Sequence, residues 1–342
     1  MSTQSLRVGV IGAGANTRTK HIPGLQAING VEVVKVCNRT QESGQRVAAE
    51  LGIPEVVTDW RDVIYDSTLD AIVIGTWPYM HKILTVAALE ADKHVMCEAR
   101  MAMNATEARA MYEAARLRPH LTAQIVPSPY SLRADRTIQR LLAEGWLGDL
   151  LAVEIRAGNE FVEEKGAPLH WRHDKDLSGL NIMSMGIWYE ALMRWVGVAQ
   201  RVTATGKTFV TTRLDSTGRL REVRIPDHID ILADLACGAS AHIQVSSVTG
   251  LAGSPSATLY GSEGTLRFVD GKLLGGKRGD SGLAEIDIPA SEAGAWRVEE
   301  EFVNAIRGQE SITHTDFLTG VKYMEFTEAV NISLAEGRSI AL

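Results

Sequence analysis

Apolar runs and helical spacings alternate along the first 126 residues of the chain. Short runs rich in Val and Ile are separated by segments whose apolar residues recur every three or four positions. Such runs are typical of buried parallel strands, and such segments are typical of amphipathic helices. The expected strands are 7–11, 31–37, 56–57, 69–75, 93–98 and 122–126, and the expected helices are 41–51, 82–91 and 106–117. The alternation predicts right-handed βαβ units and a parallel sheet over residues 1–126.

Strand-like stretches dominate the rest of the chain, after prolines 127 and 129 interrupt the pattern. Several are joined by short segments that contain Gly, which favours antiparallel pairing. The expected strands are 150–157, 201–214, 228–237, 240–248, 257–260, 265–269 and 285–288, and the expected helices are 131–144, 295–307 and 317–336. Residues 127–342 are therefore predicted to form a second α/β domain with a large, mostly antiparallel open sheet.

Alternation is clearest in the stretch 240–248. His242, Gln244 and Ser246 alternate with apolar neighbours. One face of this sheet is therefore expected to be polar and the other buried. The polar face is available to water or to a second subunit.

A glycine-rich turn directly follows the first apolar run. Gly12 and Gly14 permit backbone angles and a close approach to a ligand that other residues forbid. The amides of this Gly-Ala-Gly bend, and those at the start of the next helix around Ala15 and Asn16, are expected to bind an anion such as a pyrophosphate. Thr17 stands where dinucleotide-binding turns have a third glycine or alanine, which predicts looser packing of the helix on the strand. The turn predicts a cofactor site, and its alternative is an ordinary tight turn.

Two further strand ends belong to the same expected site. Asn38 follows the second run, where an acid often binds the adenosine ribose, and Arg39 adds a cation that can accommodate a 2′-phosphate. This pair favours NADP(H) over NAD(H), unless Arg39 only stacks on the adenine or faces water. The turn 76–81, which contains Thr76 and Trp77, follows the fourth run, and ligands of open α/β sheets lie at such strand ends.

Composition narrows the classes of partner. The 342 residues are 45% hydrophobic and 23% charged, which is ordinary for globular proteins, and the net charge is −7 without a dense Lys/Arg run. Neither nucleic acid nor a membrane is therefore expected as a partner. The three cysteines are few and far apart, and the first residues do not resemble a signal peptide. These features favour reduced thiols and a cytoplasmic location.

Several motifs appear in an order that resembles the Gfo/Idh/MocA family of oxidoreductases. They are the glycine turn followed by residues 21–23, residues 76–78 with His81, the stretch 88–98 that ends in Glu98, residues 171–172 and residues 225–228. The resemblance runs from residue 7 to the end of the chain. It implies a nicotinamide-binding domain with His81 and Glu98 at the cofactor, a second domain for a small-molecule substrate, and a homodimer or homotetramer. Family members mostly act on sugars, cyclitols and their derivatives.

The sequence departs from this family at the positions that carry its chemistry. Ala99 replaces the lysine that follows the glutamate, and Ser184 and Trp188 replace an aspartate and a histidine. Spacings of three and four place Asn181, Ser184 and Trp188 on one expected helical face, toward the substrate. Because none of these three titrates near neutral pH, the usual proton relay of the family is not expected.

Other residues are candidates for the missing chemistry. Tyr189 or His170 can act as a substitute acid or base, although an aromatic packed in the core is the alternative for Tyr189. Arg100 and Arg172 are candidate substrate-binding cations, together with the three residues of the expected helical face. No metal site is expected, because His170 and His173 lack an evident third ligand.

Three functions remain open at this point. The first is an NAD(P)-dependent oxidoreductase acting on a sugar, a cyclitol or a related hydroxy or keto compound, with a non-standard acid/base group. The second is an enzyme that retains the nicotinamide and oxidises its substrate only transiently, so that elimination or glycosidic cleavage becomes possible. The third is an NAD(P)-binding sensor without turnover.

Overall fold

The computed structural model describes residues 5–158 and 167–342, and packing divides the chain into two units. The first unit extends to Pro127 and also includes Arg297–Val321. The second unit comprises Ser128–Trp296 and Lys322–Leu342. The sequence pattern assigned everything beyond residue 126 to the second domain, but the returning segment packs with the first unit because its helix α9 (Val298–Ile306) contacts α1 (Ile22–Gln26).

The first unit is built on a six-stranded sheet in which every pair of strands is parallel. Its strands are β1 (Leu6–Ile11), β2 (Val31–Cys37), β3 (Glu55–Val57), β4 (Ala71–Ile74), β5 (His94–Cys97) and β6 (Ala123–Ile125). Their order is β3-β2-β1-β4-β5-β6, so the winding direction reverses between β1 and β4. A Rossmann-type sheet of this order places its ligand at the carboxyl ends of the strands, beside that reversal. The predicted parallel sheet is confirmed.

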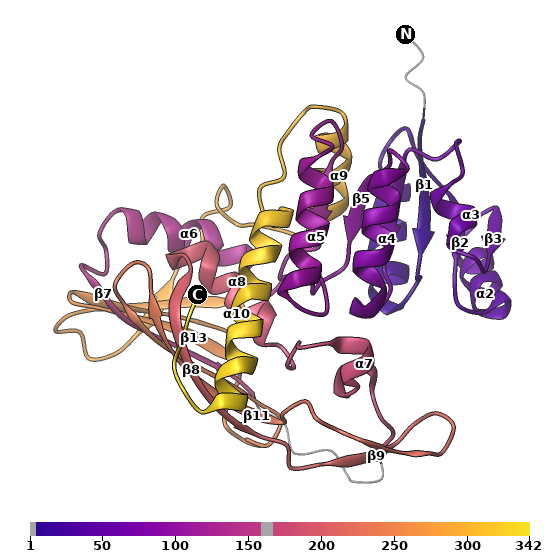
Figure 1. The fold of residues 1–342 in the computed structure, drawn as a ribbon. Helices are drawn as coiled ribbons and strands as arrows, with labels where there is room; N and C mark the ends of the chain where they lie inside the picture. Colours follow the sequence, from indigo (N-terminus) through magenta and orange to yellow (C-terminus); the bar gives the residue numbers. More distant parts are fainter. Residues whose placement is uncertain (1–4, 159–166) are drawn as a thin grey trace. The chain divides into compact units, whose positions relative to one another are not determined.

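Local signals define the helices that connect these strands (Figure 1). The helices are the π-helix η1 (Thr17–His21), which α1 continues, followed by α2 (Gln41–Leu51), α3 (Arg61–Ile64), α4 (Pro78–Glu90) and α5 (Ala105–Arg116). The hydroxyl of Thr40 accepts the N–H of Ser43 at 3.3 Å and caps α2, which ends at Gly52 in a left-handed conformation. Helix α4 begins before the expected residue 82, because Pro78 provides a suitable first turn.

The second unit contains a nine-stranded sheet in which β7 and β12 form the parallel pair among otherwise antiparallel neighbours. Its strands are β7 (Leu150–Ala157), β8 (Ala199–Lys207), β11 (His228–Leu235), β12 (Ser240–Ser246), β13 (Ser256–Gly261), β14 (Gly264–Val269), β15 (Lys272–Lys277), β16 (Ala284–Ile286) and β17 (Ile340–Ala341). The large, mostly antiparallel sheet is therefore confirmed. Its helices are α6 (Leu132–Ala143), α7 (Lys175–Ser178), α8 (Met185–Val196) and most of α10 (Phe317–Glu336), and a short turn, η2, covers Trp171–His173.

The expected strand 201–214 is interrupted in the structure. The carboxylate of Asp227 accepts the N–H groups of Phe209 and Val210 at 2.6 and 2.9 Å, so these amides are bound outside the strand ladder. The chain resumes as β9 (Thr212–Leu214), which pairs with β10 (Leu220–Glu222) in a separate hairpin. A contact with a residue further along the chain thus ends the strand.

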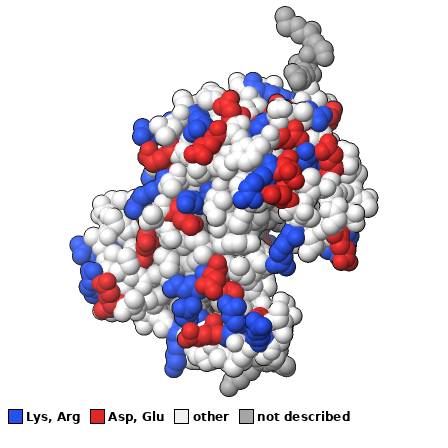
Figure 2. Space-filling view, turned by 45° about the vertical axis from the view of Figure 1, so that its right-hand side comes forward, with Lys and Arg blue, Asp and Glu red and all other residues white. Residues whose placement is uncertain are grey.

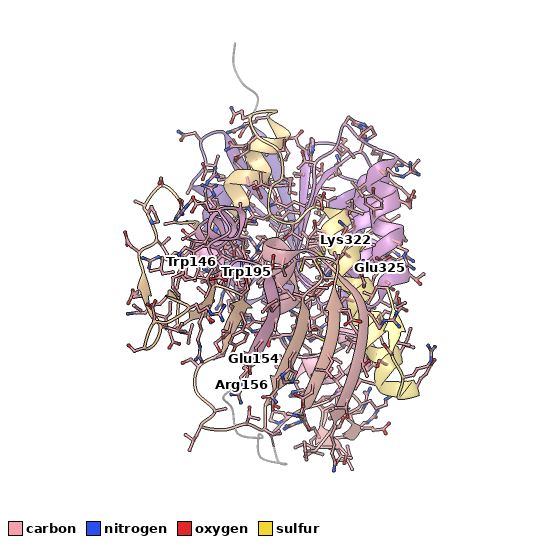
Figure 3. The ribbon with its side chains drawn as sticks, turned by 90° about the vertical axis from the view of Figure 1, so that its left-hand side faces the viewer. Trp146, Glu154, Arg156, Trp195, Lys322 and Glu325 are labelled. Atoms are coloured by element: carbon pink, nitrogen blue, oxygen red, sulfur yellow. The ribbon has the colours of Figure 1, made fainter. Side chains whose placement is uncertain are left out.

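One face of the nine-stranded sheet is polar, as the alternation predicted, except that Ser246 is buried. On this face Asp230 accepts bonds from His242 and Gln244 at 3.0 Å and contacts Nε2 of His228 at 2.9 Å. Glu154 and Arg156, two residues apart on β7, continue it (Figure 3). Both signs of charge are therefore present on the face.

Elsewhere on the surface, positive and negative side chains are interspersed over the face drawn in Figure 2. Within residues 5–158 and 167–342, no helix has both the length and the apolarity required to cross a membrane.

Candidate functional site

A cavity of about 430 Å³ opens in the first unit at the carboxyl ends of β1, β2, β3 and β4. Its lining combines the glycine turn, the ends of these four neighbouring strands and several aromatic side chains. The lining residues are Ile11, Gly12, Ala13, Gly14, Cys37, Asn38, Arg39, Thr40, Ser43, Thr58, Trp60, Gly75, Thr76, Trp77, Tyr79 and Met80. The cavity therefore lies where a doubly wound sheet binds its ligand.

The two glycines of the turn have different structural roles. Gly12 has φ +87°, and a Cβ there would lie 2.7 Å from the backbone nitrogen of Thr76. A Cβ on Gly14 would lie 3.7 Å from its nearest neighbour, the carbonyl oxygen of Gly75, which is an ordinary contact. Gly12 is thus required by the fold, whereas Gly14 leaves room beside the cavity.

The amides of the turn itself, which were expected to bind the diphosphate, are instead bound within the protein. The N–H groups of Gly12, Ala13 and Gly14 donate to the carbonyl of Cys37, the side chain of Asn38 and the carbonyl of Gly12, at 2.8 to 2.9 Å. Helical structure begins at Ala15, and the first N–H groups of a helix have no acceptor within it. The donors for an anion are therefore those of the helix start, including Ala15 and Asn16.

Thr17 does not loosen the packing of this helix, contrary to the expectation from its position. Thr17 is buried, and a Cβ on Gly75 would lie only 2.0 Å from its hydroxyl oxygen. The glycine that permits close packing is thus on the facing strand end instead of on the helix.

Asn38 and Arg39, which follow β2, differ in burial and in hydrogen bonding. The Asn38 side chain is buried, where it accepts the Ala13 N–H at 2.8 Å and donates to the hydroxyl of Ser43 at 3.0 Å. Arg39 is exposed and lines the cavity, with its guanidinium carbon 6.0 Å from the centre of the Trp77 ring. Asn38 therefore holds the turn, whereas Arg39 is exposed at the cavity.

Sequence reasoning missed Trp60 in the lining, whereas Tyr79 and Met80 lie in the turn 76–81 that was expected near the cofactor. Trp60 lies close after β3, at the same edge of the sheet as the other strand ends. The expected third strand could therefore have indicated that Trp60 lies near the site. Tyr79 and Met80 belong to the first turn of α4, whose start was expected later in the chain.

His81, expected at the cofactor, is fully buried behind this site. Its Nε2 lies 2.9 Å from the carbonyl oxygen of Thr76, and its Nδ1 lies 3.0 Å from that of Arg100. Burial lowers the pKa of His81. It therefore connects the chain after β4 with the chain after β5 and acts on a ligand only through these segments. Arg100 itself is buried in the first unit.

Glu98, which follows β5, belongs to a buried charged cluster that the sequence did not predict. Its Oε1 lies 3.0 Å from Nε2 of His21 and accepts a bond from the side chain of Asn16. Nδ1 of His21 lies 2.5 Å from Oε1 of Glu299, on α9. We call Glu98, His21 and Glu299 the carboxylate–imidazole cluster.

The two carboxylates keep His21 protonated at neutral pH. Burial alone would lower the pKa of His21, but the hydrogen bonds to Glu299 and Glu98 raise it to about 9. Burial would raise the pKa of Glu98, whereas its bond to the imidazolium lowers it. The cluster thus contains an imidazolium between two carboxylates.

In the second unit, the predicted substrate face differs from the expectation. Helix α8 begins only at Met185, after Ser184, because Met183 adopts a positive φ of 40°. Asn181 therefore lies outside the helix, where its amide donates to the carbonyl of Ser178 at 2.7 Å. Trp188 is 4% exposed, and its ring centre lies 5.3 Å from that of Tyr130. The three residues do not form one helical face.

Tyr189 is a core residue in this structure. It is 1% exposed and stacks on Phe326 with ring centres 3.6 Å apart, and its hydroxyl oxygen accepts the N–H of Ala199 at 2.8 Å. Burial raises the pKa of Tyr189 to about 12. An acid that acts near neutral pH needs the opposite shift. The structure therefore supports the packing interpretation, and we do not retain Tyr189 as a catalytic candidate.

Residues 170–173 form a compact polar turn in the second unit. His170 is exposed, and its Nδ1 accepts the N–H of Arg172 at 3.3 Å. The guanidinium of Arg172 lies 4.2 Å from the ring centre of Trp171. The rings of His170 and His173 lie 6.1 Å apart. Across the part of the chain that the structure describes, no group of three His, Cys, Asp or Glu side chains is arranged to hold a metal ion.

Two family models match successive parts of the chain. A model described as an oxidoreductase family with an NAD-binding Rossmann fold matches residues 6–123. A model described as the GFO/IDH/MocA C-terminal domain matches residues 136–267. Together they cover both units and most of the chain.

Individual relatives are dehydrogenases and reductases of small molecules. A 1,5-anhydro-D-fructose reductase from Ensifer adhaerens is 34% identical over 152 residues, which span 44% of this chain and 44% of that protein. A levoglucosan dehydrogenase from Pseudarthrobacter phenanthrenivorans is 23% identical over 78% of this chain and 74% of its own. A solved structure of levoglucosan dehydrogenase in complex with NADH and L-sorbose shares the fold, with a TM-score of 0.86 and 21% identity over 98% of each chain.

Proposed function

The chain belongs to the Gfo/Idh/MocA family of oxidoreductases, and we propose that it is an NAD(P)-dependent oxidoreductase acting on a sugar, a cyclitol or a related hydroxy or keto compound. The observation that carries this proposal is the cavity of the first unit, where a Cβ on Gly12 would collide with Thr76 and where a helix start supplies anion donors. These features fit a dinucleotide. A bound nicotinamide supplies hydride transfer.

The chain's own residues hold such a cofactor in distinct ways. The amides of Ala15 and Asn16 bind the diphosphate, and the space beside Gly14 permits its close approach. Trp60, close after β3, and Trp77, whose ring centre lies 6.0 Å from the guanidinium carbon of Arg39, provide apolar surfaces for the adenosine half. Thr76 is held in place by His81.

We further propose that NADP(H) is the preferred cofactor. Asn38 cannot replace the usual acid, because its amide is engaged with the turn and with Ser43. Arg39 is exposed at the cavity beside Thr40 and the start of the eleven-residue helix α2. A guanidinium and a helix N-terminus together favour a 2′-phosphate over a hydroxyl.

Replacing Arg39 with alanine tests this preference. Because a charge-assisted bond to the 2′-phosphate is lost, we expect Arg39→Ala to weaken NADP⁺ binding by about tenfold or more and to leave NAD⁺ binding within about twofold. Calorimetric titration with both nucleotides measures this. Arg61→Ala is the matched control, since Arg61 stacks on Trp60 in the same unit at 4.5 Å and is exposed. An equal loss for both nucleotides would show that Arg39 only stacks on the adenine.

His170 is our candidate for the missing acid/base group. Its Nδ1 accepts a backbone bond, so a neutral ring carries its proton on Nε2, and the ring is exposed. We expect His170→Gln to lower kcat by about 10²-fold or more while the Kd of the cofactor is unchanged. His173→Gln, on the same turn, is the control. Equal kcat values for His170→Gln and the wild type would exclude His170 from this role.

Three departures from the family pattern favour a protein without net turnover, which is either an enzyme that oxidises its substrate only transiently or a sensor. Ala99, Ser184 and Trp188 cannot exchange a proton at neutral pH, which suits a protein that retains its nicotinamide without net turnover. Absorbance at 340 nm with a panel of sugars and cyclitols detects net oxidation or reduction. Exchange of isotope at a substrate carbon without a net change indicates transient oxidation. Cofactor binding with neither signal indicates a sensor.

The partners follow from the same proposal. The substrate is a small molecule, and we propose that the polar face of the nine-stranded sheet joins two copies of the chain. Because Asp230 and Glu154 lie on this face with His242 and Arg156, it can pair with itself in antiparallel fashion.

A further inference from the structure

The carboxylate–imidazole cluster lies on one side of the point where the winding of the first sheet reverses. Glu98 follows β5, which is next to β4, whereas Arg39 and Trp60, two of the residues proposed for the adenosine half, follow β2 and β3. In a doubly wound sheet the other half of a dinucleotide lies over the strands on the opposite side of the reversal. Glu98 is therefore at the nicotinamide half, and its bond from Asn16 connects it to the helix start that binds the diphosphate.

The cluster contains more negative than positive groups. Two carboxylates, Glu98 and Glu299, contact one imidazolium, His21, and Asn16 adds a neutral donor. His21 and Glu299 are buried, and 15% of the Glu98 side chain is exposed. The residue after Glu98 is Ala99, so the lysine that the family places here does not offset the charge. Among the three side chains of the cluster, carboxylates therefore outnumber the imidazolium.

We propose that this cluster makes the cofactor site discriminate between the oxidation states of the nicotinamide, in favour of the oxidised ring. The inference rests on the proposed function, because it requires a bound dinucleotide. The oxidised ring carries a positive charge and the reduced ring is neutral, so a fixed negative charge nearby stabilises the oxidised form selectively. When the carboxylate and the ring lie several ångströms apart and the protein screens the charges, one charge changes the ratio of the affinities for the oxidised and reduced forms by about tenfold.

Measuring affinities for both oxidation states tests the inference without measuring activity. The full chain is titrated with NADP⁺ and NADPH, and with NAD⁺ and NADH, by calorimetry. We expect Glu98→Gln to shift the ratio of the two dissociation constants about tenfold toward the reduced form. Glu299→Gln also removes one carboxylate, but Glu299 lies on the far side of His21 from Glu98. We therefore expect a smaller shift of the ratio in the same direction. The buried guanidinium of Arg100 is present in every variant, so its effect on the ratio of the two dissociation constants is the same in each and cancels when the variants are compared.

Glu301→Gln is the matched control. Glu301 is on the same helix as Glu299 and is equally buried, but it accepts bonds from Gln124 and Thr313 instead of contacting His21. We expect its ratio to equal that of the wild type.

The possible outcomes separate this inference from the proposed function. If both oxidation states bind and the ratio is the same in Glu98→Gln, Glu299→Gln and the wild type, the inference is wrong and the proposed function stands. If the wild type binds neither form, both are wrong. If Glu98→Gln does not fold, the ratio in Glu299→Gln decides.

Discussion

Gly12→Ala is expected to destabilise the first unit severely, whereas Gly14→Ala is expected to be tolerated. An alanine at position 12 would have to adopt a φ of +87°, and its Cβ would lie 2.7 Å from the backbone nitrogen of Thr76, which follows β4. At Gly14 the nearest atom is 3.7 Å away. Strain and overlap together cost about 3 kcal/mol or more, which corresponds to a fall in Tm of about 10 °C. Thermal unfolding followed by circular dichroism compares the two variants.

A larger residue at Gly14 should affect binding instead of folding. The branches of a valine would extend into the cavity beside the proposed diphosphate site, so we expect Gly14→Val to abolish nucleotide binding while its Tm remains near that of Gly14→Ala. Calorimetry with NADP⁺ measures the loss. Unchanged affinity would mean that the turn does not hold the diphosphate, even though it follows a strand and precedes a helix.

Elements whose pattern is carried by their own residues were predictable from the sequence. The buried runs of β1, β2 and β4 and the polar alternation of β12 were all found as expected. Elements that depend on a distant contact were not. The break after β8 requires Asp227, and the late start of α8 requires a positive φ at Met183, which no local signal announces.

The site divides in the same way. Strand ends reveal the cavity, because the carboxyl ends of parallel strands share one edge of the sheet, and Gly12, Arg39 and Trp77 were found by this rule. Glu299 could not be found, since 278 positions separate it from His21 and its helix returns from beyond the second unit. A buried histidine has no sequence signature that distinguishes it from one at a ligand.

Raising the pH from 7 to 9 is expected to destabilise the first unit. The pKa of His21 is about 9 in the folded protein, above its ordinary value of 6.5. His21 therefore binds its proton more tightly in the folded state than in the unfolded state, and this difference stabilises the folded protein. The stabilisation is complete below pH 6.5 and disappears as the pH rises through 9. The shift corresponds to about 3 kcal/mol, of which about 2 kcal/mol is lost between pH 7 and 9. Denaturant unfolding at successive pH values measures it.

Two variants assign this dependence to His21. In His21→Gln the carboxylates of Glu98 and Glu299 lose the charge between them, so we expect a loss of about 3 to 5 kcal/mol at pH 7 and a flatter profile up to pH 9. His120→Gln is the control, because His120 also contacts a carboxylate, that of Asp92 at 2.7 Å, but 61% of its side chain is exposed. Such an exposed pair contributes little to stability, because solvent screens it. A wild-type profile that is flat from pH 7 to 9, or one that keeps its slope in His21→Gln, would show that the imidazole is not held as an imidazolium between the two carboxylates.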